Sequence, residues 1–195
     1  MEGIRIILAS ASPRRKELLS RLGWEFEVMP SDAAEAHIPG ETPSDMVMRL
    51  SRLKGRDCAL AFPDALVIAS DTAVFCGGEI LGKPSDAEDA FSMLKTLRGR
   101  AHEVYSGLAL FLRGECSCSY ARTEVVFRAL SDEDLRAYIA TGECFGCAGA
   151  YAIQGKASLM VERISGDYSN VVGLPMPLLA EMLKGFGFSV SDILH

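Results

Sequence analysis

The chain has 195 residues, of which 49% are hydrophobic and 24% charged, and its formal net charge at pH 7 is −6. This composition is typical of a globular protein, and the length suits one domain over residues 1–195, either undivided or as two small lobes around a cleft. The acidic balance argues against a nucleic-acid-binding protein, although a few Lys and Arg residues in a cleft can still bind a small anion. No apolar run approaches the roughly 18 to 20 residues of a membrane span, and no signal peptide is evident, so we expect a cytoplasmic protein without membrane contact.

In the first half of the chain, strand-like and helical segments alternate. Residues 4–8 and 65–69 are short apolar runs typical of buried strands. Three helices are expected over 12–23, from 42 to about 61, and over 85–99, because each begins with a residue that favours the N-cap position and the first and third end at glycine.

The second half begins with two strands, at 104–112 and 123–127, which we expect to pair around a turn at Arg113-Gly114. A helix from Ser131 to Gly142, a strand at 159–161 and a last helix over 175–184 follow. The whole order predicts an α/β fold with a mixed central sheet flanked by helices.

The segment from Ser10 to Arg15 joins the first strand to the first helix. Small residues there let a ligand approach the backbone, and the N–H groups and dipole of a helix N-terminus favour an anion. The guanidinium group of Arg14 can hold two phosphate oxygens. A capped surface helix with solvated arginines fits the same pattern.

Lys54 lies on the apolar stripe of the second helix, four residues from both Leu50 and Cys58. An inward-facing lysine is unfavourable unless it meets an anion, although its ammonium group could also reach solvent at the edge of the stripe. Asp71 follows the second buried strand, where α/β proteins bind ligands. Its carboxylate could hold a divalent metal, accept a proton from water or simply cap a turn.

Two glycine-rich segments carry further candidates. Residues 77–84 contain Lys83, which could bind a polyphosphate or belong to a solvated hairpin. Residues 148–155 contain Gln154, whose amide offers the donor and the acceptor that reading a base edge requires. Tight strands with turn glycines would explain this second segment equally well.

The cysteines could form a metal or redox site. Cys144 and Cys147 have the spacing of a redox pair or half a zinc site, and Cys116 with Cys118 could supply the other half. A C-x-C pair is a poor partner for C-x-x-C, so reduced cysteines near loops are the simpler interpretation. The chain has six cysteines: Cys58, Cys76, Cys116, Cys118, Cys144 and Cys147.

Together these motifs resemble the Maf family over nearly the whole chain, in their order as well as their content. The matching pieces are residues 10–15, 70–72, 80–84, 97–104, 141–143, 148–155 and 166–175. The resemblance implies a Maf/ITPase-like fold with a cleft between two lobes. It also implies metal-dependent hydrolysis of nucleoside triphosphates between the α and β phosphates, which releases a monophosphate and pyrophosphate.

The resemblance also assigns roles to single residues. It implies that Asp71 is the proton acceptor and that Asp71 and Glu35 bind a divalent metal cation, Mg²⁺ or Mn²⁺. The phosphate-binding residues that it implies are Ser10, Arg14, Lys54 and Lys83. At the three positions that mark the subgroup acting on dTTP and UTP, the chain has Arg14, Thr72 and Gln154.

Two positions depart from the family pattern, and two other functions stay open. Gly146-Cys147 stands where the family often has Asp-Lys, and Glu35 lies in a less acidic run than usual. A related pyrophosphatase could prefer purine, 7-methyl-GTP or other modified nucleotides. A non-catalytic nucleotide sensor or septum-inhibition protein could keep the phosphate-binding cations. A homodimer is compatible with the sequence.

Overall fold

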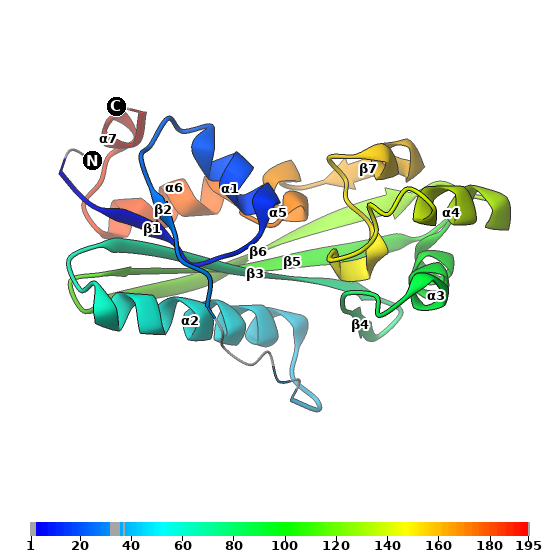
Figure 1. Ribbon diagram of the computed structural model, residues 1–195, viewed down its shortest axis with the longest axis horizontal. Coiled ribbons are helices and arrows are strands. Elements are labelled where there is room, and N and C mark those ends of the chain that lie inside the picture. The colour runs from blue at the N-terminus through cyan, green and yellow to red at the C-terminus, as the bar shows by residue number, and fades with distance from the viewer. Residues whose placement is uncertain (1–2, 32–35, 37, 195) are drawn as a thin grey trace. The chain divides into compact units, whose positions relative to one another are not determined.

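The computed structural model describes residues 3–31, 36 and 38–194 (Figure 1). The helices are α1 (Pro13–Ser20), α2 (Pro43–Ala61), α3 (Ala87–Leu97), α4 (Asp132–Ile139), α5 (Tyr168–Val172), α6 (Met176–Gly185) and α7 (Val190–Leu194). The strands are β1 (Ile6–Leu8), β2 (Glu27–Val28), β3 (Leu66–Cys76), β4 (Glu79–Leu81), β5 (Ala101–Leu112), β6 (Glu115–Phe127) and β7 (Val161–Ser165). Two short 3₁₀ helices are η1 (Ala148–Ala150) and η2 (Lys156–Met160).

The strands form one mixed sheet of seven strands in the order β2-β1-β3-β5-β6-β7, with β4 paired to β3. β1 runs parallel to β2 and to β3, whereas the pairs β3–β4 and β6–β7 are antiparallel. The turn between β5 and β6 lies at Arg113-Gly114, as expected, and both residues have positive φ, of 52° and 81°. The mixed α/β class predicted from the sequence is therefore confirmed.

The chain divides into two compact units. The first consists of Met1–Asp71, Ser106–Ala121 and Gly173–His195, and the second of Thr72–Tyr105 and Arg122–Val172. Strands β3, β5 and β6 each contribute residues to both units.

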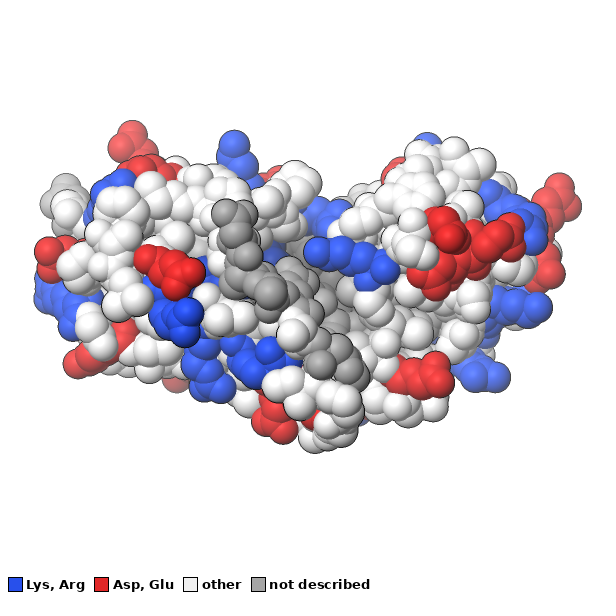
Figure 2. Space-filling model, turned by 60° about the horizontal axis from the view of Figure 1, so that its bottom comes forward, with Lys and Arg blue, Asp and Glu red and all other residues white. Residues whose placement is uncertain are grey.

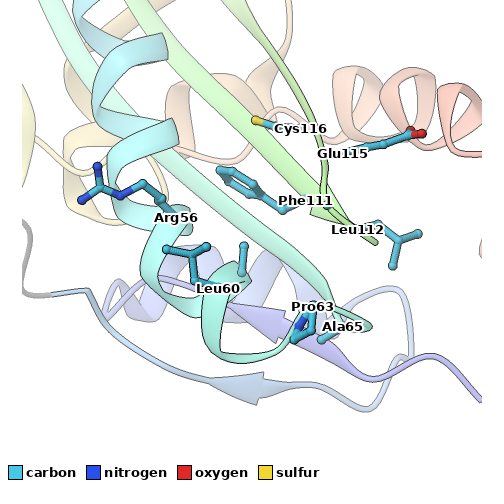
Figure 3. Close-up of a pocket in the computed structure, with 10 residues that line it drawn as sticks. Arg56, Leu60, Pro63, Ala65, Phe111, Leu112, Glu115 and Cys116 are labelled. Carbon is cyan, nitrogen blue, oxygen red and sulfur yellow. The ribbon is translucent and has the colours of Figure 1, made fainter.

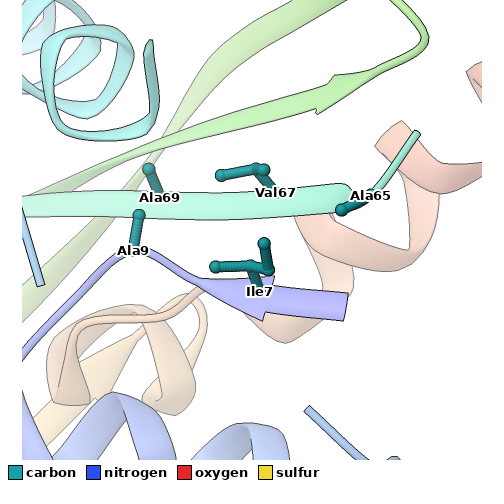
Figure 4. Close-up of a cluster of buried hydrophobic side chains, with 5 residues drawn as sticks. All are labelled: Ile7, Ala9, Ala65, Val67 and Ala69. Carbon is teal, nitrogen blue, oxygen red and sulfur yellow. The ribbon is translucent and has the colours of Figure 1, made fainter. Parts of the chain in front are cut away.

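The core of the first unit lies between β1, β3 and α2. Figure 4 shows Ile7 and Ala9 of the β1 segment beside Val67 and Ala69 of β3, and all four are buried. Cys58 and other residues of α2 pack against this cluster. In the first unit, α2 covers one face of the sheet, and α1 and α6 cover the other (Figure 1).

Helix α2 lies unusually close to the sheet because two glycines leave room for it. A Cβ atom added at Gly55 would lie 2.4 Å from the ring of Phe111 and 3.1 Å from Cβ of Ala69. A Cβ added at Gly107 of β5 would lie 2.2 Å from the carbonyl oxygen of Val47. Such distances are far below van der Waals contact, so any larger residue would push α2 away from the strands.

The second unit has its own buried aromatic cluster. The rings of His102, Phe127 and Tyr151 meet edge to face, with centroids 4.9–5.5 Å apart. Nε2 of His102 and the hydroxyl group of Tyr151 are hydrogen-bonded at 2.9 Å. Between α3 and α4, the guanidinium group of Arg136 lies 4.2 Å from the ring centroid of Phe91.

Most predicted helix starts are confirmed, and one is wrong by a residue. Ser12, Thr42 and Ser131 are the N-caps of α1, α2 and α4. For α3 the N-cap is Asp86, whose side chain accepts the N–H of Asp89, rather than Ser85. Ser85 instead donates its N–H and its hydroxyl group to the Asp89 carboxylate, at 2.9 and 3.2 Å.

Several expectations about element boundaries are wrong. The strands expected at 104–112 and 123–127 begin earlier, at Ala101 and Glu115, and the helices expected to end at Gly23 and Gly142 end at Ser20 and Ile139. The strand expected at 65–69 continues to Cys76, because β4 pairs with its second half. The segment expected as a strand at 159–161 is mostly the helix η2, with Leu159 76% exposed, and β7 begins at Val161. The helix α6 is not the last one, since α7 follows it.

Among the described residues, no helix combines the length and apolar character that a membrane crossing needs. On the face shown in Figure 2, Lys and Arg side chains alternate with Asp and Glu side chains instead of forming one continuous basic surface.

Candidate functional site

The candidate site in the first unit centres on an ion pair between Lys54 and Asp71. Nζ of Lys54 donates to Oδ1 of Asp71 at 2.5 Å, and the two side chains are only 12% and 9% exposed. The sequence placed Lys54 on the inward stripe and left open whether its ammonium group meets an anion or reaches solvent; in the structure it contacts the Asp71 carboxylate. Lys54 reaches it because the neighbouring Gly55 lets α2 lie against β3.

Asp71 lies inside β3 rather than after its end, which corrects the expected position. The rule that ligands bind beyond the carboxyl ends of strands applies here to β1, which ends at Leu8 opposite Ile68. Beyond that pair, Ala9 donates its N–H to the Ile68 carbonyl at 2.8 Å, and the β1 chain then turns into the Ser10 loop. Asp71 therefore lies on the strand that continues after the parallel pairing has ended.

The loop from Ser10 to α1 is fixed mainly by Arg15. Nη1 of Arg15 donates to Oγ of Ser10 at 3.2 Å, and Nε donates to the carbonyl oxygen of Gly173 at 2.8 Å. Ser70, next to Asp71, donates its hydroxyl to the same carbonyl at 2.9 Å. Gly173 thus connects the Ser10 loop with the strand that carries Asp71.

Arg15 holds the loop together, a structural role that sequence reasoning missed because both arginines look alike in the motif. Arg14 is half-buried at the start of α1. The N-cap residue Ser12 forms no side-chain hydrogen bond with the first turn of this helix, unlike Thr42 at the start of α2. This arrangement suits an anion at the N-terminus of α1.

A second missed residue is Arg49, one and a half turns before Lys54 on α2. Its guanidinium group binds the Glu41 carboxylate through Nε at 2.7 Å and Nη2 at 2.6 Å, and Nη2 also donates to the Ala36 carbonyl at 3.0 Å. These hydrogen bonds with Glu41 raise the pKa of Arg49 above its ordinary value, and the charge of Asp71 adds to the effect. Arg49 is thus paired with Glu41, and its charge also interacts with that of Asp71. No single-residue motif in the sequence indicates a bidentate pair of this kind.

The other predicted residues belong to the second unit. Thr72 follows Asp71 in β3 and is half-buried, Lys83 is exposed after β4, and Gln154 is half-buried between η1 and η2. The segments that carry Lys83 and Gln154 are joined, because Gly149 donates its N–H to the Gly82 carbonyl at 2.9 Å.

Glu35, the second carboxylate expected to bind metal, lies outside the described residues. Within the described ranges, no group of three or more His, Cys, Asp and Glu side chains is arranged to hold a metal ion. A Mg²⁺ ion typically uses one or two protein carboxylates and completes its shell with water and substrate phosphates. The buried Asp71 carboxylate is a donor of this kind, so the residues present fit such an ion.

The six cysteines are all free in the structure. Cys116 and Cys118 lie on β6, in residues of the first unit, and Cys144 and Cys147 are buried in the turn after α4 of the second unit. Burial raises the pKa of the Cys118 thiol to about 11, which keeps it protonated and poorly suited to bind a metal.

A hollow of about 290 Å³ lies elsewhere in the first unit, at the C-terminal end of α2 (Figure 3). Its walls are mainly apolar and come from α2, the segment after it and the β5–β6 hairpin; the lining residues include Leu60, Pro63, Phe111 and Leu112. Of the described residues that the sequence singled out, Cys116 lines this hollow, whereas Ser10, Arg14, Lys54, Asp71, Thr72, Lys83 and Gln154 do not.

Comparison with known proteins places the chain among close relatives. A family model described as "Maf-like protein" matches residues 5–186. A dTTP/UTP pyrophosphatase from Geotalea uraniireducens is 52% identical over 184 residues, which cover 93% of this chain and 95% of that protein. The dTTP/UTP pyrophosphatase from Geobacter sulfurreducens is 50% identical over 189 residues, covering 96% and 99% respectively. The one from Caldanaerobacter subterraneus is 50% identical over 200 residues, covering 97% and 96%.

Among solved structures, the Ham1 protein of Staphylococcus aureus matches with a TM-score of 0.47 and 16% identity, over 63% of this chain and 71% of that one. The family model and the relatives, in contrast, match nearly the full length of the chain. The residues that the family model matches include all the motifs from the Ser10 loop to Gly173. The chain belongs to the Maf family.

Proposed function

We propose that this protein hydrolyses dTTP and UTP to the nucleoside monophosphate and pyrophosphate, and so removes these or related pyrimidine nucleotides from the nucleotide pool. The single observation that carries the proposal is the buried Lys54–Asp71 pair, in which a carboxylate is held beside a phosphate-binding type of cation. The names of the three relatives at 50–52% identity support the choice of substrate.

Asp71 is the proposed proton acceptor. Lys54 holds the carboxylate through Oδ1 and keeps it oriented, so that Oδ2 can take the proton from the water that attacks the α-phosphorus. General-base catalysis needs this kind of fixed geometry at hydrogen-bond distance from the water. Pyrophosphate then leaves with both bridging electrons, and the α-phosphate keeps the new oxygen.

Cations stabilise the charge of the phosphates in this proposal. Arg14 and Ser10 bind phosphate oxygens at the N-terminus of α1, where the helix dipole adds to the attraction. Lys54 and Lys83 supply ammonium groups to the triphosphate. For phosphoryl transfer, positioning and electrostatic stabilisation of this kind provide most of the rate enhancement.

We further propose that Asp71, together with Glu35, binds Mg²⁺ or Mn²⁺. When bound, such an ion neutralises phosphate charge and favours departure of pyrophosphate. Both units would act as a single domain, since the family match over residues 5–186 runs through both of them. The free cysteines suit a reducing compartment such as the cytoplasm.

The proposed base selectivity rests on Arg14, Thr72 and Gln154. The side-chain amide of Gln154 can donate to and accept from the edge of a thymine or uracil ring, and a site that pairs with a base in this way rejects bases that leave its polar atoms unpaired.

A panel of nucleoside triphosphates with pyrophosphate detection tests the proposal. We expect dTTP and UTP to be hydrolysed with higher kcat/KM than CTP, dATP, dGTP and 7-methyl-GTP, and we expect EDTA to stop the release of pyrophosphate. A preference for purine or methylated nucleotides would overturn the base selectivity. Binding of nucleotides without chelator-sensitive release of pyrophosphate would identify a nucleotide sensor instead.

A further inference from the structure

We propose that Glu143 is a positioning residue that orients Gln154 and thereby sets the selectivity for the base. This inference rests on the proposed function, because it assumes that Gln154 reads the base of a nucleotide. Glu143 does not contact the substrate in this proposal. It acts through the backbone that follows Gln154.

The carboxylate of Glu143 binds the residues directly after Gln154. Oε2 accepts the backbone N–H of Lys156 at 2.8 Å, and Oε1 lies 3.9 Å from Nζ of the same lysine. The Glu143 side chain is 28% exposed, so the hydrogen bond with the backbone is partly shielded from water.

Gly155 makes this close approach possible. A Cβ atom added at Gly155 would lie 2.3 Å from Oε2 of Glu143, closer than any two such atoms can come. The backbone angles at this position are φ −100° and ψ −149°, so Gly155 is not in the left-handed region. A side chain at position 155 would therefore displace the Glu143 carboxylate from its present place.

The backbone of Glu143 is itself held by hydrogen bonds in the turn after α4. Its N–H donates to Oγ1 of Thr141 at 3.3 Å, and its carbonyl oxygen accepts the thiol of Cys147 at 3.3 Å. Cys144 and Cys147 are both buried, with exposed fractions of 0% and 3%. The carboxylate thus extends from a fixed backbone, which a flexible surface glutamate would not provide.

The other side of Gln154 is fixed by the same region of the unit. The hydroxyl group of Tyr138 on α4 accepts the N–H of Ala152 at 3.1 Å. Gly155 in turn donates its N–H to the Ala152 carbonyl at 2.9 Å, so Gln154 lies inside a closed turn. Tyr138 thus binds the residue at the start of this turn, Ala152, and Glu143 binds the residue just after its end, Lys156.

Hydrogen bonds on both sides of Gln154 would fix the orientation of its side-chain amide, on which recognition of a base depends. Its amide presents a donor on one side and an acceptor on the other, and only one orientation matches a given base edge. Small displacements of a positioned group reduce its contribution strongly. Loss of the hydrogen bond between Glu143 and the N–H of Lys156 would let the turn and the Gln154 amide move. The selectivity for the preferred base would then fall.

Glu143→Ala, Glu143→Gln and the control Glu133→Ala test this idea, with Glu133 being an exposed residue of α4. We expect Glu143→Ala to raise KM for dTTP about tenfold, to change kcat less than about threefold, and to lower the kcat/KM ratio of dTTP over dGTP about tenfold. Glu143→Gln should retain most of the selectivity, because its amide oxygen can still accept the N–H of Lys156. Glu133→Ala should match the wild type.

Gly155→Ala provides an independent test. Its methyl group would occupy the place of Oε2, so it should reproduce the selectivity loss of Glu143→Ala. In the Glu143→Ala background the same substitution should add little, because the carboxylate it displaces is gone. Thermal melting shows which variants fold. If Glu143→Ala does not fold, the selectivity of Gly155→Ala tests the inference in its place.

The outcomes separate this inference from the proposed function. If the wild type does not hydrolyse dTTP or UTP, the proposed function fails. If the wild type is selective, and folded Glu143→Ala or Gly155→Ala keeps the wild-type ratio of dTTP over dGTP, Glu143 does not position Gln154. Fully additive effects of the two substitutions, or a loss in Glu143→Gln as large as in Glu143→Ala, would also overturn the inference.

Discussion

The ammonium group of Lys54 and the carboxylate of Asp71 form a buried ion pair, with Nζ 2.5 Å from Oδ1. The two residues come from different elements, α2 and β3, and the contact exists because Gly55 and Gly107 let the helix lie against the strands. The pair fixes the orientation of the proposed proton acceptor.

Replacement of Asp71 tests its role in the reaction. We expect Asp71→Asn to abolish turnover of dTTP, because an amide cannot accept the proton of water. Its oxygen can still accept a hydrogen bond from Lys54, so the variant should fold, but with a lower free energy of unfolding because the buried ammonium group loses its counter-charge. Steady-state kinetics and circular dichroism would measure both effects. Asp64→Asn, at an exposed position of the same unit, is the matched control. Near wild-type turnover in purified Asp71→Asn would show that another group is the base.

Removal of the lysine tests the energetics of the pair. Lys54→Met leaves the buried Asp71 carboxylate without its cation, so we expect the free energy of unfolding to fall by about 3 kcal/mol. The double variant Lys54→Met/Asp71→Asn should recover part of this loss, because it no longer buries an uncompensated charge. Urea unfolding of the single and double variants measures the coupling. A change below about 0.5 kcal/mol in Lys54→Met would mean that the pair does not stabilise the fold.

The role of Gln154 can be separated from catalysis by kinetics. We expect Gln154→Ala to raise KM for dTTP and UTP more than it lowers kcat, because the side chain binds the base and not the reacting phosphates. Ser158→Ala, at an exposed position in η2, should leave both constants unchanged. An unaltered preference among nucleotides in Gln154→Ala would remove this residue from base recognition.

Stability at acid pH should depend on His102. Burial lowers the pKa of this imidazole from 6.5 to about 4, and a protonated ring would also place an N–H at Nδ1, which has no hydrogen-bond partner among the described residues. The neutral form is favoured in the folded state, so its contribution is complete above about pH 6.5 and is lost as the pH falls to about 4. The shift corresponds to about 3 kcal/mol.

Unfolding of the wild type and of His102→Gln at a series of pH values between 7 and 4 would check this expectation. The wild type should lose more stability over this range than the variant, which has no titrating ring at that position. Parallel losses in the two proteins would show that other groups account for the acid sensitivity.

The motifs with local physical causes could be predicted from the sequence. N-caps are set by a residue and the few that follow it, so the starts of α1, α2 and α4 were placed correctly at Ser12, Thr42 and Ser131. The buried strands around Ile7 and Val67 follow from short apolar runs. The inward position of Lys54 follows from helical periodicity.

Features that depend on distant partners could not be predicted in this way. The continuation of β3 beyond Asp71 depends on its pairing with β4, a strand of only three residues. The pairing of Arg49 with Glu41 joins residues on a helix and in the loop before it. The hydrogen bond by which Arg15 holds the Ser10 loop goes to Gly173, 158 residues away. Helices of five residues, such as α5 and α7, carry too short a pattern to recognise.

The central claim is that water, activated by Asp71, attacks the α-phosphorus of dTTP. Hydrolysis of dTTP in ¹⁸O-enriched water, followed by ³¹P NMR or mass spectrometry of the products, tests this claim most directly. We predict that the label appears in dTMP and that pyrophosphate contains none. Label in pyrophosphate, or release of dTDP and labelled inorganic phosphate, would contradict it.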